Sequence, residues 1–431
     1  MEFDSKGNPK IVVSAVTSMI DSPIDIQIHH LKPNQIVTLK ASRIAEGIKE
    51  IHLESFGKFR ADRTGLVNLN TQCPIEGTYN SIDGMGLFWS LDTTKIVTKN
   101  DRSQTVGQVL EPQKLKLSLI IDNVIVDEIL INRLWKSNQI NRISVREKGL
   151  VATFFSDVNK EQRPGIIIVG GSEGGINEYP AALLASHGFS VLALAYFGIE
   201  HLPKRLVIIP LEYVKTAIDW MKSRPEVKED LIGIHGTSKG SELALLAGCY
   251  FSDIKAVVSL NGSAVSLSGI VPWSEDDTLP PSWTYNGNPI PYASPINPKK
   301  IAVECREMWL NREGNPFGKW YAAITSDEEI VEKATIPVEK INGPILLISG
   351  EEDGGDTVRL SQKAIERLNT YNFAFSYNHL IYAGAGHSIG IPYLRANPYN
   401  QGNKYDTAKA SKDSWNKTVE FFSENLKVNL N

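Results

Sequence analysis

The sequence feature that most constrains the fold is a G-x-S-x-G pentapeptide at residues 236–240, reading Gly-Thr-Ser-Lys-Gly. An apolar segment at 231–234 precedes it, and a helix-favouring run at 241–247 follows it. This strand–turn–helix context is that of a nucleophile elbow, in which a sharp turn presents a serine hydroxyl at the carboxyl edge of a sheet. The flanking small residues let strand and helix pass closely. We therefore predict that Ser238 is a catalytic nucleophile; an ordinary strand-to-helix turn is the alternative.

Length and composition bound the class of protein. A chain of 431 residues is too long for one typical core, so two or three domains are expected. Its 42% hydrophobic and 22% charged residues are typical of a globular protein. The net charge of -4 argues against a general nucleic-acid binder. No apolar run reaches 18 residues, so we predict no membrane span, and nothing in the sequence indicates an oligomeric state.

Targeting and cysteine signals predict a cytoplasmic location. Residues 1–6 are polar and lack the apolar core of a signal peptide. The last three residues, Asn-Leu-Asn, differ from the peroxisomal S-K-L signal. Cys73, Cys249 and Cys305 form no C-x-x-C motif and no disulfide framework, which fits a reducing compartment.

The first third of the chain has a β pattern. Short β-prone runs lie at residues 11–13, 25–28, 36–39, 51–54, 65–69, 115–119 and 124–126. Turn residues separate them, and no long helix intervenes, so we predict an all-β sandwich over residues 1–141. Residues 84–91 are apolar and Gly-rich, and we expect them in the core or against a second domain.

Beyond a polar break at residues 142–149, strands alternate with helices. Predicted strands lie at 150–155, 165–169, 191–195, 231–234, 256–260, 344–348 and 379–382, and predicted helices at 179–187, 211–221 and 407–426. This alternation predicts a doubly wound, mostly parallel α/β domain over residues 142–431. An excursion at about 262–342 is rich in proline and aromatic residues, and we expect a lid or pocket wall there.

The acid partner of the serine is expected after the strand at 344–348. On this fold the chain order is serine, acid, histidine, each at the carboxyl end of a strand. Residues 350–356 read Gly-Glu-Glu-Asp-Gly-Gly-Asp, and we predict Asp353, because small residues after it permit a tight turn. The neighbouring carboxylates that remain as alternatives are Glu351, Glu352 and Asp356.

The general base is expected after the last strand. His387 lies there in a loop of small residues, and a serine hydroxyl needs such a base near neutral pH. His235 is the competitor, but it precedes the serine, and we expect it to pack beside the strand.

The oxyanion hole requires two backbone N–H groups. Lys239, directly after the nucleophile, should supply one. The loop at 170–175, reading Gly-Gly-Ser-Glu-Gly-Gly, should supply the other from Ser172 or Glu173. A phosphate-binding loop is a weaker reading, because no P-loop lysine follows and the spacing is not G-x-G-x-x-G.

Several stretches together resemble one family over nearly the whole chain. They are residues 85–91, 177–179, 194–197, 200–204, 211–213, 236–243, 261–263, 386–387 and 391–393. The more specific ones are Gly-Thr-Ser-Lys-Gly-Ser-Glu-Leu at 236–243 and Leu-Ala-Tyr-Phe at 194–197. The chain resembles the acyl-CoA thioesterases that share a fold with bile acid-CoA:amino acid N-acyltransferase. The resemblance implies an immunoglobulin-like amino-terminal domain and an α/β-hydrolase carboxyl-terminal domain.

Carried over by position, the resemblance places the family's nucleophile at Ser238, its acid at Asp353 and its base at His387. It implies hydrolysis of fatty acyl-CoA, with no metal or other cofactor. Relatives that conjugate amino acids often carry cysteine as nucleophile, so the serine favours hydrolysis. An acyl-CoA:amino acid N-acyltransferase and a carboxylesterase are the alternatives. The acid loop departs from the family pattern, because Gly354 and Gly355 stand where bulkier residues are usual.

Coenzyme A carries phosphates, so basic side chains are expected near the mouth of the site. The candidates are Lys204, Arg205 and the side chain of Lys239. Solvated surface charge is the other reading of each.

Overall fold

The computed structural model describes residues 7–45, 49–98, 110–159, 161–271, 277–395 and 401–427. The chain divides into two compact units, which are described separately. The first comprises Met1–Ser137 and Ile391–Asn397, and the second comprises Asn138–Gly390 and Pro398–Asn431. The polar amino terminus at 1–6, the carboxyl end at 428–431, and Pro272 with Trp273 of the excursion lie outside the described residues.

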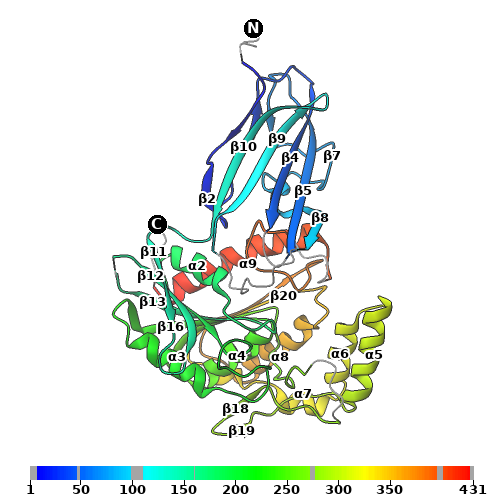
Figure 1. The fold of residues 1–431 in the computed structure, drawn as a ribbon. Coiled ribbons are helices and arrows are strands. Elements are labelled where there is room, and N and C mark those ends of the chain that lie inside the picture. Colours follow the sequence, from blue (N-terminus) through cyan, green and yellow to red (C-terminus); the bar gives the residue numbers. More distant parts are fainter. Residues whose placement is uncertain are drawn as a thin grey trace. The chain divides into compact units, whose positions relative to one another are not determined.

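The first unit is built from β-strands. Its elements are β1 (Lys10–Val13), β2 (Thr17–Met19), β3 (Ile26–His29), β4 (Ile36–Ala45), β5 (Lys49–Arg60), β6 (Val67–Asn68), β7 (Glu76–Gly77), α1 (Gly86–Trp89), β8 (Asp92–Thr98), β9 (Gln113–Ile121) and β10 (Val124–Leu134). One sheet has the order β1-β3-β6 and the other β2-β10-β9-β4-β5-β7, with β8 paired to β5 (Figure 1). Val37, Leu39 and Ala41 alternate along β4 and are buried, as in a strand with one face on a core. The first unit is therefore β-rich, as predicted.

Residues 84–91 lie in the core of this unit. Helix α1 covers part of them, and Leu87, Phe88 and Trp89 are at most 4% exposed. The Trp89 indole N–H donates to the Asp83 carboxylate over 2.8 Å. The expectation of a core segment is confirmed.

A short piece from late in the chain completes the first unit. Residues Ile391–Asn397 belong to it, although they follow the last strand of the second unit in sequence. The Arg395 guanidinium donates from Nε to the Leu91 carbonyl over 3.1 Å. Tyr393 and Arg395 line a small cavity together with Arg133, which is 2% exposed. The chain thus leaves the second unit and returns to it within a few residues.

The second unit contains one eight-stranded sheet. Its strands are β11 (Ile140–Val145), β12 (Val151–Asp157), β13 (Arg163–Val169), β14 (Ser190–Ala195), β16 (Val227–Thr237), β17 (Ile254–Leu260), β20 (Ile345–Gly350) and β21 (Tyr377–Tyr382). The spatial order is β11-β12-β14-β13-β16-β17-β20-β21. The β11–β12 and β12–β14 pairs are antiparallel, and the other neighbours are parallel. The predicted mostly parallel sheet is present, in a mixed form.

The polar break expected at residues 142–149 is wrong in its first half. Strand β11 occupies Ile140–Val145 and pairs with β12, with Arg142 opposite Phe155. Only Ile140 and Val145 in this strand are buried, because it forms the edge of the sheet. An edge strand with exposed polar residues lacks the apolar alternation on which the prediction depended.

Helices cover both faces of this sheet. They are α2 (Glu178–Ser186), α3 (Glu212–Lys222), α4 (Lys239–Tyr250), α8 (Thr357–Thr370) and α9 (Lys404–Asn425). In Figure 1, α2 and α9 lie on one face and α3, α4 and α8 on the other. The approach is close: a Cβ at Gly233 would lie 2.7 Å from the Phe422 ring of α9, and one at Gly165 2.8 Å from Met221 of α3. Glycine at these two strand positions lets the helices settle onto the sheet.

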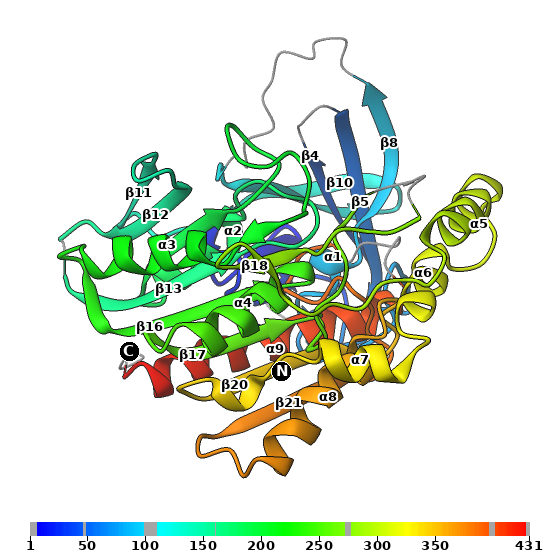
Figure 2. The same ribbon diagram turned by 90° about the horizontal axis from the view of Figure 1, so that it is seen from below.

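The described residues of the excursion between β17 and β20 form regular elements. The excursion contains β18 (Trp283–Tyr285), β19 (Asn288–Pro289), α5 (Pro298–Asn311), α6 (Pro316–Ile324), α7 (Glu328–Ala334) and a 3-10 turn, Val338–Lys340; β18 also pairs with β15 (Ile209–Pro210). Figure 2 shows α5 and α6 side by side at the margin of the second unit. Pro298 and Pro316 each stand in the first turn of a helix, where the missing N–H costs nothing.

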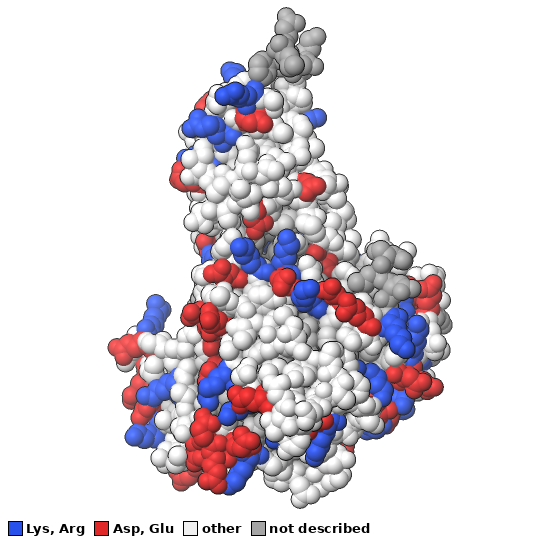
Figure 3. Space-filling model, turned by 180° about the vertical axis from the view of Figure 1, so that it is seen from behind, with Lys and Arg blue, Asp and Glu red and all other residues white. Residues whose placement is uncertain are grey.

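Surface, segment and cysteine properties add three observations. Figure 3 shows acidic and basic side chains interspersed on the visible face. Among the described residues, no helix combines the length and the apolar character that a membrane crossing requires. Cys73, Cys249 and Cys305 are all free thiols.

Candidate active site

Ser238 occupies a strained turn between β16 and α4. Its backbone has φ 53° and ψ -122°, a conformation that non-glycine residues rarely adopt and that costs roughly 1–3 kcal/mol. Two backbone hydrogen bonds hold it: the Ser238 N–H donates to the Leu260 carbonyl over 2.8 Å, and its carbonyl accepts from the Ser241 N–H over 2.9 Å. The turn therefore has the geometry of a nucleophile elbow.

The small residues around this turn are required by backbone contacts. A Cβ at Gly236 would fall on the carbonyl of Gly240, and a Cβ at Gly240 would fall on the carbonyl of Gly170. A Cβ at Gly171 would lie 2.9 Å from the Cβ of Ser238. The glycines thus bring the 170–175 loop against the serine.

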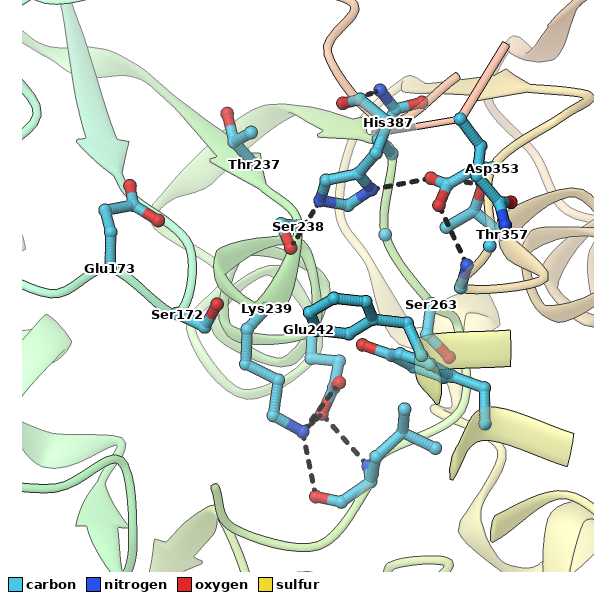
Figure 4. A pocket seen from close by; sticks show the side chains of 18 of the residues that line it. Ser172, Glu173, Thr237, Ser238, Lys239, Glu242, Ser263, Asp353, Thr357 and His387 are labelled. Carbon is cyan, nitrogen blue, oxygen red and sulfur yellow. Dashed lines mark hydrogen bonds and ion pairs between the residues drawn. The ribbon is translucent and has the colours of Figure 1, made fainter. Parts of the chain in front are cut away.

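Ser238, His387 and Asp353 form a continuous chain of hydrogen bonds (Figure 4). His387 Nε2 lies 3.0 Å from Ser238 Oγ, and His387 Nδ1 lies 2.7 Å from Asp353 Oδ2. A carboxylate can only accept, so Nδ1 carries the proton and the lone pair of Nε2 faces the serine hydroxyl. The structure brings together the three residues that the sequence singled out.

Asp353 is held by the turn that follows β20. The Gly355 N–H donates to Oδ1 over 2.9 Å, and the Thr357 hydroxyl donates to Oδ2 over 3.1 Å. The residue is 7% exposed. These donors fix the carboxylate while one oxygen faces the imidazole.

The competing carboxylates lie elsewhere. Glu351 and Glu352 are exposed to solvent. Asp356 forms an ion pair with Arg359 at 2.6 Å. Of the four carboxylates that the sequence offered, Asp353 is the one that contacts His387.

Two opposing effects act on His387. Burial disfavours the imidazolium, but the hydrogen bond and the charge of Asp353 favour it, with a further contribution from Glu173. The net result is a pKa raised above the usual value of a histidine. His235 contrasts with it, because burial lowers the pKa of His235 to about 4 and the side chain is 3% exposed inside the unit. His235 is buried on β16, as expected of a residue that packs beside the strand.

Backbone amides border the serine from two directions. The Lys239 N–H lies at the first position of α4, where no intrahelical acceptor exists. In the 170–175 loop, the Gly171 N–H is already donated to the Glu173 carboxylate over 3.0 Å. Ser172 and Glu173 both line the pocket, so both remain candidates for the second N–H donor of the oxyanion hole.

Two positioning residues escaped the sequence reasoning. The Tyr196 hydroxyl donates to the Gly170 carbonyl over 2.8 Å and so braces the 170–175 loop. Asn261 donates from Nδ2 to the His387 carbonyl over 2.7 Å and accepts from the Gly350 N–H over 3.0 Å. Asn261 thereby ties the acid loop to the histidine loop. Both residues stood in the stretches that carry the family resemblance, but nothing in the sequence gave them a role.

The predicted role of the Lys239 side chain in phosphate binding is wrong. Its ammonium donates to both oxygens of Glu242, over 2.8 and 2.9 Å, and to the Leu267 carbonyl over 3.0 Å. Glu242 also accepts from the Leu267 N–H and from the Trp283 indole. The two side chains are 4% and 1% exposed, so the lysine faces inward. Lys204 and Arg205 are exposed, and their role at coenzyme A stays a prediction.

The serine opens into a cavity of about 390 Å³. Its charged and titratable walls are Glu173, Lys239, Glu242, Tyr321, Asp353 and His387. Within the described residues, no group of three or more histidine, cysteine, aspartate or glutamate side chains is arranged to hold a metal ion. The arrangement suits attack by a serine alkoxide on a carbonyl group.

The mixed eight-stranded sheet, with a serine elbow after its fifth strand in spatial order, is that of an α/β hydrolase. The family model described as "BAAT / Acyl-CoA thioester hydrolase C terminal" matches residues 209–428, and "Acyl-CoA thioester hydrolase/BAAT N-terminal region" matches residues 21–147. The chain belongs to the BAAT / acyl-CoA thioester hydrolase family.

Relatives named as N-acyltransferases and relatives named as thioesterases are both similar to this chain over nearly its full length. Acyl-coenzyme A amino acid N-acyltransferase 1 of Mus musculus is 29% identical over 438 residues, covering 97% of this chain and 98% of the relative. Acyl-coenzyme A thioesterase 6 of Mus musculus is 29% identical over 429 residues, covering 96% of each. A solved dienelactone hydrolase-like phosphotriesterase, P91, from metagenomic libraries is 14% identical with a TM-score of 0.40, covering 66% of this chain and 98% of that one.

Proposed function

We propose that this protein is an acyl-CoA thioesterase that hydrolyses fatty acyl-CoA to free fatty acid and coenzyme A. The observation that carries the proposal is the hydrogen-bonded chain from Ser238 through His387 to Asp353, with separations of 3.0 and 2.7 Å. Membership of the BAAT / acyl-CoA thioester hydrolase family supports a thioester as substrate.

In the first half-reaction, Ser238 Oγ attacks the thioester carbonyl while His387 Nε2 takes the hydroxyl proton. The amides of Lys239 and of Ser172 or Glu173 stabilise the oxyanion. The C–S bond then breaks, and the departing thiolate of coenzyme A takes the proton from His387. Asp353 stabilises the imidazolium between these transfers and holds its ring orientation.

In the second half-reaction, water replaces the thiol. His387 Nε2 takes a proton from water as its oxygen attacks the acyl-serine carbonyl. The Ser238–acyl bond breaks, Ser238 Oγ recovers the proton, and the fatty acid leaves. No redox step occurs, and each proton removed by His387 is returned.

The charge of the pocket supports water over an amino acid as acceptor. Glycine and taurine each present an anionic group. Among the described residues that line the cavity, the one lysine or arginine is Lys239, and its three donors are already satisfied by Glu242 and Leu267. Glu173 and Asp353 add negative charge nearby. Such a pocket repels an anionic acceptor and admits water.

The test is product analysis of the purified protein with an acyl-CoA, with and without glycine or taurine. We expect free fatty acid and coenzyme A in equal amounts, unchanged by either amino acid. Ser238→Ala should lower kcat by about 10⁴-fold or more, whereas the exposed Ser326→Ala should leave it unchanged.

Two outcomes would favour another activity. A conjugate formed faster than free acid would favour an acyl-CoA:amino acid N-acyltransferase, the activity named for the relative described above. Turnover of simple oxygen esters far above that of thioesters would favour a carboxylesterase. Full activity of Ser238→Ala would overturn the serine mechanism itself.

The finer features of the architecture also belong to this proposal. We infer that the first unit forms an immunoglobulin-like sandwich, supported by its two sheets, and that the second unit carries the catalysis. The three free thiols fit a reducing cytoplasm.

A further inference from the structure

A second cavity adjoins the one that holds Ser238. It measures about 340 Å³, and five of its walls are shared with the first cavity, namely Ser172, Lys239, Leu267, Phe317 and Tyr321. Its other walls are Ser268, Gly269, Ile270, Val271, Ala302, Cys305, Trp309, Pro316, Trp320 and Ile324. The shared walls make it a side chamber of the serine pocket.

The walls of the chamber are mainly apolar, whereas those of the serine pocket include many polar and charged side chains. Helices α5 and α6 form one side of it with Ala302, Cys305 and Ile324, which are at most 6% exposed. No carboxylate is among the described residues that line it, and its one cation, Lys239, is neutralised by Glu242. A ligand that enters from the serine therefore meets hydrocarbon and aromatic surface.

We propose that this chamber binds the aliphatic chain of the acyl group; this rests on the function proposed above. A water-sized group occupies ~30 Å³ in a liquid, so about 340 Å³ accommodates roughly ten chain carbons. The substrate class is then a medium-length, flexible acyl-CoA with its carbonyl at Ser238.

Longer chains would continue over the outer rim of the chamber. Trp309 and Phe317 line it and are 57% and 59% exposed, with ring centroids 6.3 Å apart. Each methylene moved from water to an apolar site favours binding by about fourfold. The value of kcat/KM should rise steeply with chain length up to about ten carbons, and more slowly beyond.

The test fills the chamber from one helix. Ala302→Trp places a large ring inside it, while Val303→Trp adds the same ring one residue along α5, at a side chain that is 50% exposed and outside the chamber. We expect Ala302→Trp to lower kcat/KM for decanoyl-CoA at least tenfold relative to acetyl-CoA. The matched Val303→Trp should leave that ratio within twofold of the original. An unchanged ratio in Ala302→Trp would overturn the proposal.

A binding measurement separates this inference from the proposed function. Calorimetric titration of Ser238→Ala with decanoate needs no turnover. Weaker decanoate binding in Ser238→Ala/Ala302→Trp than in Ser238→Ala/Val303→Trp supports the chamber, even if the wild-type protein hydrolyses no thioester. Equal binding in the two double variants would overturn it, even if hydrolysis is confirmed.

Discussion

The pocket holds two acid–base pairs, the fully buried Lys239 with Glu242 and the partly exposed His387 with the buried Asp353. Lys239 has three N–H donors, and all three meet acceptors in Glu242 and Leu267. His387 has two ring nitrogens, of which one meets Asp353 and the other faces Ser238. In the first pair every N–H donor of the lysine has an acceptor, whereas in the second pair one ring nitrogen of the histidine faces the serine hydroxyl. The difference shows that burial and charge do not by themselves make a pair catalytic; an unsatisfied bonding position does.

Electrostatics sharpens the contrast. Burial lowers the pKa of Lys239 and raises that of Glu242, while their mutual attraction opposes both shifts. Burial would likewise lower the pKa of His387, but Asp353 outweighs it and the pKa rises. In the first pair desolvation outweighs the mutual attraction, so keeping both side chains charged costs free energy. In the second, the hydrogen bond to Asp353, its charge and that of Glu173 together outweigh desolvation, which makes the histidine a better proton acceptor.

The largest expected effect comes from Asp353→Asn. An amide cannot hold the Nδ1–H tautomer of His387, so we expect kcat to fall about 10⁴-fold with the fold retained. Steady-state kinetics with an acyl-CoA and circular dichroism measure the two parts. The matched control is Asp356→Asn, three residues on and paired with Arg359. An equal loss in the control would refute the assignment of Asp353.

A smaller effect, on stability, is expected from the pair of Lys239 and Glu242. Glu242→Ala leaves the Lys239 ammonium buried without its partner, which should lower the free energy of unfolding by about 3–5 kcal/mol. The double variant Lys239→Met/Glu242→Leu should recover most of this loss and keep catalytic activity, because the Lys239 backbone amide is still present. Denaturant unfolding and kcat measure both. A double variant that is stable but inactive would mean that this pair also acts in catalysis.

The smallest effect concerns the pH profile. Because the pKa of His387 is raised above 6.5, the histidine stays protonated to higher pH, and kcat/KM should climb with rising pH through an apparent pKa above 6.5. Glu173→Gln removes one of the charges that raise this pKa and keeps the loop backbone. The rise of kcat/KM with pH should therefore move to lower pH by a few tenths of a unit. Added salt should reduce the shift, because Glu173 is exposed. A rise of kcat/KM that moves to higher pH in Glu173→Gln would contradict the predicted direction of the shift.

The framework of the second unit could be predicted from short stretches of sequence. The strand β13 has six fully buried residues in succession and therefore reads as an apolar run. The elbow is equally local, because its glycines and its serine lie within five residues. His387 followed from chain order once the last strand was recognised.

Other features depended on contacts between distant residues. The choice of Asp353 among four neighbouring carboxylates is made by a turn that points one of them at His387, 34 residues away. The proline- and aromatic-rich sequence of the excursion predicts a lid or pocket wall but no particular helices, yet Pro298 and Pro316 each stand in the first turn of a helix. The Lys239 side chain seemed free because the sequence does not show that Glu242 turns toward it one helical turn later.

The return of Ile391–Asn397 to the first unit has a consequence for how this protein can be divided. The chain passes between the units at three points, and the second of these lies four residues after His387. Deleting residues 1–137 would remove the Leu91 carbonyl that accepts the hydrogen bond from Arg395. A cut at residue 137 would therefore not separate the two units, because residues 391–397 of the first lie within the sequence of the second.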